Sequence, residues 1–318
     1  MTAGPRLLTD ELRAWVGREA AYTAPEELGR ASIRYYALAL GDENPLYRDE
    51  EFARGSRFGG IVAPPTLICE TNQLYPARAA GQGYIGHLWE LPLPIPCRLL
   101  RGGNQYEFLQ PVRPDDRLSV TWRLVELREQ PTRSRGLVLL VVSEARYHNQ
   151  RREPLAVNRE TVIYQPVEPV PVEAPAAGER EEEATTAGGE ELPPLEVAIT
   201  LPVLVAYAGA TWDWHPYHYD QQLAREAGLP GPFVDGQMWG GLLARLVLAW
   251  AGRDAWLRRL WLRYRSLLFC GEMARCRGWV AAREERKGCT LIRCSLRVEA
   301  GDGRVVVDGA GAEVELPR

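Results

Sequence analysis

The sequence predicts an α+β protein built from two similar halves, each an antiparallel sheet wrapped around a central helix. Two observations support this fold class. In each half, segments with helical spacing precede segments whose apolar residues recur with a period of two. In addition, a stretch that begins near residue 36 recurs without gaps 171 residues later. The 318 residues are enough for two ordinary domains.

The first half is expected to start with helices and to end with strands. Helices are predicted over residues 7–20, 25–40 and 66–79, the last after a turn of small residues at 59–65. Prolines just before a helix are tolerated because the first helical amides lack partners. Strands are predicted over residues 105–109, 117–128, 136–148 and 157–164.

The second half repeats this order. A helix is expected at 201–210, a glycine and proline turn at 228–236, and a long apolar helix at 237–251. Strands are expected at 260–269, 274–286, 290–299 and 304–315. Because strands that follow one another in sequence usually pair, both sheets should be antiparallel.

A segment poor in large apolar groups separates the halves. Residues 166–194 consist mainly of proline, glutamate, alanine and glycine, which cannot bury enough surface to order themselves. We therefore predict a domain at 1–165, a linker at 166–194 and a second domain at 195–318.

Composition excludes several classes of partner. The net charge is −4 and the arginines are interspersed with acids, so nucleic acid is not an expected partner. No apolar run approaches the roughly 20 residues that span a bilayer, so no membrane insertion is expected. The six cysteines form no Cys-x-x-Cys pair and no apolar signal segment precedes the first charges. These features predict a cytoplasmic chain with reduced thiols.

The strongest indication of chemistry is an acid–base pair. Asp213 and His218 stand five residues apart in TWDWHPYHYD, a stretch that holds two of the four histidines in the chain. A carboxylate and an imidazole that reach one water molecule can perform the proton transfers of addition to, or elimination from, a carbon–carbon double bond. The stretch therefore predicts an enzyme that acts on such a bond.

The repeat contains a degraded copy of this pair. Asp42 matches Asp213, but Tyr47 stands where the second copy has His218. A phenol with a pKa near 10 exchanges protons near neutrality less readily than an imidazole with a pKa near 6.5. We therefore expect the first half to be catalytically degenerate. Asp49 and Asp220 occur in both copies and are expected to cap turns or helices.

Other interpretations of these residues stay open. Asp213 could have a purely structural role as a cap of backbone amides, because its counterpart Asp42 persists in the degraded copy. His218 could be a hydrogen-bonded core histidine, although its replacement by Tyr47 speaks against a purely structural role. A metal set with His215 is a weak alternative, because Pro216 intervenes and no cysteine or glutamate supports it. No metal is expected.

The order of elements and the Asp-x-x-x-x-His segment resemble the MaoC-like enoyl-CoA hydratases and dehydratases of the hotdog fold, over nearly the whole chain. GDENPLYRDEEFA, GGIVAPPT and GGNQYEFLQPVRPDD resemble the N-terminal half of two-hotdog members. DWHPYHYDQQLAREAG and GGLLARLVLAWAG resemble the catalytic half, in a form similar to members that act on bulky acyl-CoAs. The resemblance implies a double hotdog whose sheets join edge to edge.

The family pattern also implies roles for residues. It transfers the water-holding pair to Asp213 and His218, and the oxyanion-binding amide at the start of the central helix to Gly236. This chain departs from the pattern at three positions. His215 replaces the usual asparagine, Asp235 replaces a common histidine, and Ala244 lies where a serine is often found.

Several further residues are candidates for the binding of substrate. His215 and Asp235 flank the predicted site, and Met238 and Trp239 are expected to line an acyl pocket from the central helix. Aromatic residues at such positions are also common in cores. The basic residues Arg258, Arg259, Arg263 and Arg265 could contact the phosphates of coenzyme A or could be solvated along a strand.

The resemblance implies reversible hydration of a trans-2-enoyl-CoA to an (R)-3-hydroxyacyl-CoA, with a bulky or long acyl group and no cofactor. Two alternatives are a non-catalytic acyl-CoA-binding subunit of a heteromeric dehydratase and a hotdog thioesterase. The expected partner is an acyl-CoA thioester. Further association into a homodimer or higher oligomer, or with a different subunit, is expected from family habit and from open strand edges.

Overall fold

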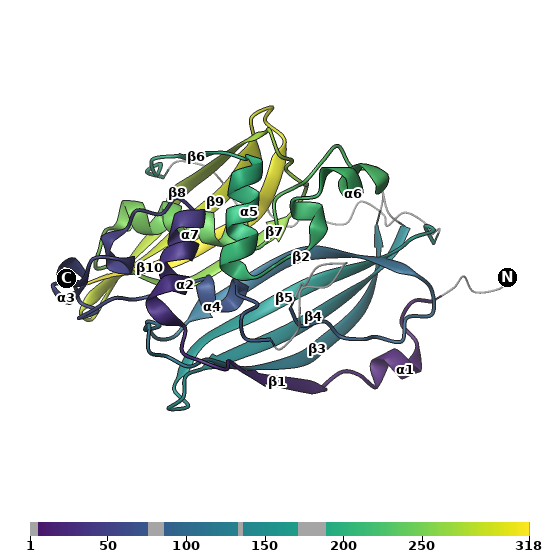
Figure 1. The fold of residues 1–318 in the computed structure, drawn as a ribbon, viewed down its shortest axis with the longest axis horizontal. Helices are drawn as coiled ribbons and strands as arrows, with labels where there is room; N and C mark the ends of the chain where they lie inside the picture. The colour runs from purple at the N-terminus through teal and green to yellow at the C-terminus, as the bar shows by residue number, and fades with distance from the viewer. Residues whose placement is uncertain (1–5, 76–85, 133–135, 171–188, 318) are drawn as a thin grey trace.

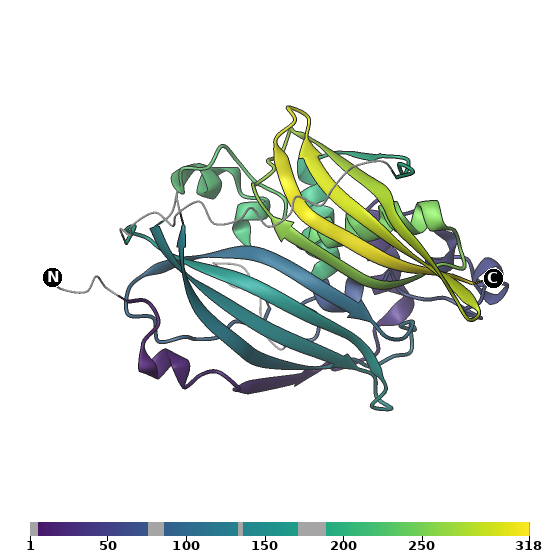
Figure 2. The same ribbon diagram turned by 180° about the vertical axis from the view of Figure 1, so that it is seen from behind.

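A single ten-stranded antiparallel sheet organises the computed structural model, which describes residues 6–75, 86–132, 136–170 and 189–317. The strand order is β1-β3-β4-β5-β2-β7-β10-β9-β8-β6, so the first five strands belong to the first half and the last five to the second. Figures 1 and 2 show these two groups lying beside each other, with the longer helices gathered on one side of the sheet. The predicted α+β class and the edge-to-edge junction are confirmed.

Within its described residues, the first half contains four α-helices and five strands. Its elements are α1 (Asp10–Arg13), β1 (Glu19–Thr23), α2 (Gly29–Ala39), α3 (Glu50–Arg54), α4 (Leu67–Glu70), β2 (Cys97–Phe108), β3 (Ser119–Thr132), β4 (Gly136–His148) and β5 (Pro154–Pro166). The four predicted strands are all present, and β2 starts earlier than expected because Cys97 already pairs with Pro166. The predicted helix at 25–40 is α2.

Two predicted helices of the first half are wrong in extent. The helix expected at 7–20 is reduced to α1, because Gly17 adopts a φ of +91° and donates its amide to Leu124 O, after which β1 pairs with β3. The helix expected at 66–79 ends at Glu70, and Thr71 has extended backbone angles. The remainder of that prediction, from residue 76, lies outside the described residues. The first half therefore has a central helix of four residues.

The second half retains a full central helix. Its elements are β6 (Leu195–Ala198), α5 (Leu201–Thr211), α6 (Gln221–Glu226), α7 (Met238–Ala251), β7 (Trp256–Tyr264), β8 (Met273–Arg286), β9 (Cys289–Ala300) and β10 (Val305–Pro317). α7 packs against β7, β8, β9 and β10. Ten of its fourteen residues are buried, so its stability comes from packing inside the curved sheet.

The two halves meet at β2 and β7. Gly103 pairs with Arg263 and Glu107 pairs with Arg259, in antiparallel register. A Cβ on Gly103 would stand 2.4 Å from Leu262 O, so only glycine allows this close approach. The basic residues proposed for coenzyme A lie on or next to β7, a strand inside the joined sheet, and Arg258 is 3.6 Å from Glu315.

A buried polar cluster joins the halves above the sheet. Tyr36 of α2 and Tyr207 of α5 have ring centroids 6.0 Å apart, and both hydroxyls donate to the Glu70 carboxyl. Burial raises the pKa of Glu70 to about 8. A buried carboxyl that is protonated near neutrality therefore holds the two halves together.

The predicted linker lies mostly outside the described residues, which include only 166–170 and 189–194 of it. Glu191 forms a bridge with Trp279 of β8. All six cysteines are free thiols. In the described part of the chain, no helix is long and apolar enough to cross a membrane.

Candidate active site

Asp213 is fixed at the end of α5 by its backbone and by its burial. Its amide donates to Ala208 O at 3.0 Å, and its side chain is 2% exposed. The residue before it, Trp212, ends the helix with a φ of +59°, a left-handed conformation that is uncommon for a bulky residue. Such a conformation persists only where the surroundings impose it, and it occurs often at functional sites.

A tight turn then places His218 beside the carboxylate. Pro216 starts a single 3-10 turn over Pro216–His218, and its fixed φ suits that position. The Nδ1 atom of His218 lies 2.8 Å from Phe233 O. Because a carbonyl oxygen only accepts, Nδ1 carries the proton in neutral His218 and Nε2 keeps its lone pair. His218 can therefore act as a base through Nε2.

His215 supports this turn. Its Nδ1 accepts the Tyr217 amide at 3.3 Å, and its own amide donates to Asp213 Oδ1 at 3.1 Å. Burial, followed by the charge of His218, lowers the pKa of His215 to about 4. His215 is therefore neutral near pH 7 and stabilises the turn, and its contact with a substrate stays a prediction.

The opposite wall is the segment that leads into α7. Asp235 Oδ1 accepts the Gln237 amide at 3.2 Å, and the amide of Gly236 donates to no acceptor among the described residues. Leu204, Tyr207, Ala208, Asp213, His218, Asp235 and Met238 line a narrow crevice of about 210 Å³. The structure thus brings Asp213, His218, Asp235 and Met238 together. Trp239 is buried in the core and does not line this crevice.

Gly236 is enclosed by side chains on both sides. A Cβ at this position would stand 3.3 Å from Tyr264 Cζ and 3.4 Å from Arg101 Cδ. Tyr264 is held in place because its hydroxyl donates to Asn104 Oδ1 at 2.7 Å. The Gly236 backbone therefore lies between side chains that are held in place, and its role as an oxyanion donor stays a prediction.

Sequence reasoning missed Arg101, which the first half contributes from β2. Its guanidinium lies 3.3 Å from Asp235 Oδ1, 3.7 Å from Asp213 Oδ2 and 2.5 Å from Glu160 Oε1. The pairing of β2 with β5 shifts register between Arg101 and Gly103, and such a bulge redirects the adjacent side chain. The only sequence sign of this is the Gly102-Gly103 pair, which does not reveal the distant partners.

The charges of this cluster shift the titration of Asp213. Burial, followed by the neighbouring charge of Asp235, raises the pKa of Asp213 to about 6. The charges of His218 and Arg101 and the His215 amide act in the opposite direction. A carboxyl with a pKa near 6 can both accept and deliver a proton near neutral pH.

The degraded copy has the same backbone as the site but lacks its chemical groups. Asp42 N donates to Ala37 O, Asn44 N to Asp42 Oδ1, and Leu46 N to Asn44 Oδ1, each with its counterpart 171 residues later. By the same offset, Tyr47 replaces His218 and Pro65 replaces Gly236, so the first copy has neither the imidazole nor the amide N–H. Its predicted catalytic degeneracy therefore rests on two missing groups.

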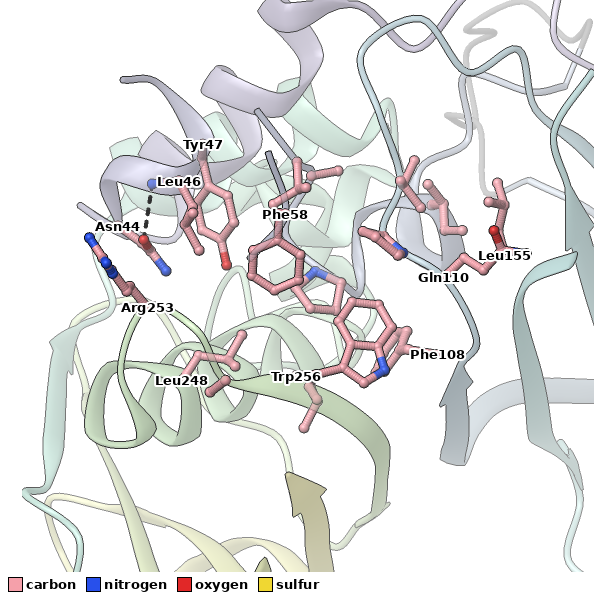
Figure 3. Close-up of a pocket in the computed structure, with 18 of the residues that line it drawn as sticks. Asn44, Leu46, Tyr47, Phe58, Phe108, Gln110, Leu155, Leu248, Arg253 and Trp256 are labelled. Carbon is pink, nitrogen blue, oxygen red and sulfur yellow. Dashed lines mark hydrogen bonds between the residues drawn. The ribbon is translucent and has the colours of Figure 1, made fainter. Parts of the chain in front are cut away.

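A pocket with a larger volume than the crevice at Asp213 lies at this degraded copy. Its volume is about 510 Å³, including space open to solvent, and Figure 3 shows Tyr47, Phe58, Phe108, Leu248 and Trp256 around it. Its lining is largely apolar. Size therefore does not identify the reactive site in this molecule, whereas the arrangement of ionisable groups does.

Two further expectations concern caps and metals. Asp49 Oδ1 accepts the Phe52 amide and Asp220 Oδ1 accepts the Leu223 amide, so both aspartates are confirmed as helix caps. Within the described residues, no group of three or more histidine, cysteine, aspartate or glutamate side chains is placed to hold a metal ion.

Two family models match successive parts of the chain. Residues 14–158 match the FAS1-like dehydratase domain region, and residues 183–300 match the MaoC like domain. A UPF0336 protein of Streptomyces avermitilis is 37% identical over 34% of this chain and 68% of its own length. A probable enoyl-CoA hydratase alpha subunit of Thermomonospora curvata is 28% identical over 46% of this chain and 49% of its own length.

Solved structures share the whole architecture. A MaoC-like dehydratase superposes with a TM-score of 0.73 and 22% identity, over 95% of this chain and 99% of its own. A conserved hypothetical protein of Mycobacterium tuberculosis, described as a double hotdog fold, has a TM-score of 0.65 and 13% identity, over 95% and 96% of the two chains. The chain therefore belongs to the MaoC-like dehydratase family, as a two-domain member with a double hotdog fold.

Proposed function

We propose that the protein is a hydro-lyase that reversibly hydrates a trans-2-enoyl-CoA to an (R)-3-hydroxyacyl-CoA. The observation that carries this proposal is the meeting of Asp213 and His218 in one crevice with the N-terminal end of α7. A free amide N–H there can donate a hydrogen bond to the thioester oxygen and stabilise the negative charge that develops on it. The matched MaoC like domain and the relative named as an enoyl-CoA hydratase subunit support the same reaction class.

The proposed reaction needs one water molecule and two proton transfers. His218 Nε2 removes a proton from water, whose oxygen bonds to the β-carbon while the double-bond electrons move toward the thioester carbonyl. The Gly236 amide hydrogen-bonds the resulting enolate oxygen, and the proton that His218 took from the water is then delivered to the α-carbon, which returns the imidazole to its neutral form. Asp213 holds the water and takes part in this delivery. Both groups act on the same water, so their individual proton assignments could be exchanged.

The short α4 supports a bulky or long acyl group. The second half fills its sheet with the fourteen residues of α7, whereas the corresponding helix of the first half has four. A shortened helix takes up less of the concave face of a sheet. We therefore assign the acyl portion of the substrate to the side of the crevice that faces the first half.

The proposal is tested by following the loss of enoyl-thioester absorbance with a panel of enoyl-CoAs. His218→Ala and Asp213→Asn are each expected to reduce kcat/KM by about 10³ while the protein stays folded, since each removes a proton-transfer group. Asp42→Asn, the matched change in the degraded copy, is expected to leave the rate within about fivefold. Equal rates in wild type and both site variants would contradict the assignment.

A second candidate is a non-catalytic acyl-CoA-binding subunit. Asp235 Oδ2 is buried without a hydrogen-bond partner in the described structure, an arrangement that does not favour an adjacent oxyanion, and one relative is named as an alpha subunit. This candidate predicts that the isolated protein binds enoyl-CoA without turnover. A thioesterase would instead release free coenzyme A, which a thiol reagent detects in the same assay.

A further inference from the structure

We propose that Arg101 is a positioning residue of the site, supplied by the first half, whose guanidinium offsets the negative charges of Asp213 and Asp235 beside the Gly236 amide. The inference deepens the proposed hydration and rests on it. Among the predicted site residues, all come from the second half, so this assignment makes the site a composite of both halves.

The position of Arg101 carries the inference. Its guanidinium bridges Asp235 at 3.3 Å and Asp213 at 3.7 Å, and the exposed fraction of its side chain is 23%, against 4% and 2% for the two aspartates. Its third contact, to Glu160 of β5 at 2.5 Å, anchors the other edge of the guanidinium. A planar guanidinium with five donors suits such a three-way contact better than a lysine ammonium.

The contacts of Arg101 balance the negative charges of the two aspartates. Two buried carboxylates in one crevice repel each other, so without a cation one of them would hold a proton. Asp235 also precedes the amide that receives the developing oxyanion, and a bare carboxylate there would oppose that charge. Arg101 offsets both effects, since it contacts both carboxylates and its Cδ lies 3.4 Å from the Cβ position of Gly236.

The titratable groups around Arg101 and its two aspartates come from several elements. The acids are Asp213 at the end of α5, Asp235 before α7, Glu160 of β5 and Glu70 of α4, and the other groups are His215, His218 and Tyr264 of β7. Arg101 is the cation that contacts Asp213 and Asp235 directly. Removing the charge of Arg101 is therefore expected to favour the protonated form of Asp213.

The departure of Asp235 from the family pattern follows from this arrangement. A carboxylate at this position is compatible with the reaction only when a cation accompanies it, and here the cation comes from β2. The two residues are thus expected to be energetically coupled, which a double-mutant cycle measures.

The experiment compares Arg101→Gln, Asp235→Asn and the double variant R101Q/D235N in the enoyl-CoA assay, with the full chain. Arg101→Gln is expected to lower kcat/KM roughly hundredfold, because it leaves two uncompensated carboxylates at the oxyanion site. The double variant is expected to be at least about tenfold more active than Arg101→Gln, since Asp235→Asn removes one of those charges. Arg98→Gln, an exposed arginine of the same strand, is the matched control.

A second readout separates positioning from mere structural support. NMR titration of Asp213 is expected to give a higher pKa in Arg101→Gln than in wild type, and the pH profile of kcat/KM should move in the same direction. Wild-type rates in Arg101→Gln, an unchanged Asp213 titration, or a double variant no better than Arg101→Gln would each overturn the inference. Absence of turnover in wild type would instead refute the proposed function, and the NMR titration would still test Arg101.

Discussion

The two Asp-containing loops of this protein share a backbone and differ in their chemistry. In both loops, the aspartate carboxylate accepts the amide N–H of the residue two positions later. The aspartate amide donates to the carbonyl oxygen of a helix residue five positions earlier. Only the second loop carries an imidazole at His218 and a glycine amide at Gly236, where the first has Tyr47 and Pro65. The comparison shows that the aspartate stabilises the loop in both copies. The proposed reaction requires, in addition, the imidazole and the glycine amide, which only the second copy has.

The first half also contributes to the candidate site and to the fold. The first half donates Arg101 to the site, supplies Glu70 to the buried cluster under Tyr207, and completes the sheet through β2. Its loss of an acid–base pair therefore does not make it dispensable. We expect the halves to be inseparable in function, although only one carries the reactive groups.

Among the changes that compare the two copies, the largest loss of activity is expected when the second copy receives the proline of the first. Gly236→Pro removes the amide N–H, and we expect kcat/KM to fall by about 10² to 10³ because an oxyanion donor is lost. The reverse change, Pro65→Gly, should leave the rate within about threefold. Steady-state kinetics of both variants, with circular dichroism to verify folding, provide the measurement. Activity retained in Gly236→Pro would assign the oxyanion site elsewhere.

A smaller effect, on stability, is expected from Glu70 in the buried polar cluster that joins the halves. The pKa of Glu70 is raised from 4.5 to about 8, so between these values the folded protein keeps a proton that the unfolded chain releases. The unfolding free energy that this group contributes therefore falls as pH rises through that window, by at most about 1.4 kcal/mol per pH unit. Glu70→Gln should abolish this dependence.

The check is denaturant unfolding of wild type and Glu70→Gln at pH 5, 6, 7 and 8. The difference in unfolding free energy, variant minus wild type, is expected to increase steadily with pH. A difference that is constant across the range would show that Glu70 is ionised in the folded protein at pH 5.

The smallest effect is expected from restoring only the imidazole of the first copy. Tyr47→His in a His218→Ala background should add no measurable turnover, since Pro65 still offers no amide N–H to an oxyanion. The assay is single-turnover kinetics at high enzyme concentration. Recovery of activity would show that an imidazole beside Asp42 is sufficient, and would remove the amide from the explanation of the degenerate half.

Much of this molecule could be predicted from local patterns. Strands β2 to β5 and β7 to β10, the helices α2, α5 and α7, the repeat, and the proximity of Asp213 to His218 follow from periodicity and from short spacing. The failures were the helices expected at 7–20 and 66–79, the strands β1 and β6, which were not predicted, and the strand expected at 260–269, which lies at Trp256–Tyr264. The spacing of apolar residues favoured a helix over both 7–20 and 66–79. In the first, residues 19–23 instead form β1, which pairs with β3. In the second, the helix ends at Glu70.

The sequence by itself determined the acid–base pair, because five residues and one proline-initiated turn suffice to bring Asp213 and His218 together. Only the tertiary structure decided what surrounds them. Arg101 is more than one hundred residues from either aspartate and reaches them through the β2–β7 junction and a bulge. The physical reason is that ion pairs across a sheet depend on strand order and register, which are long-range properties that spacing along the chain does not encode.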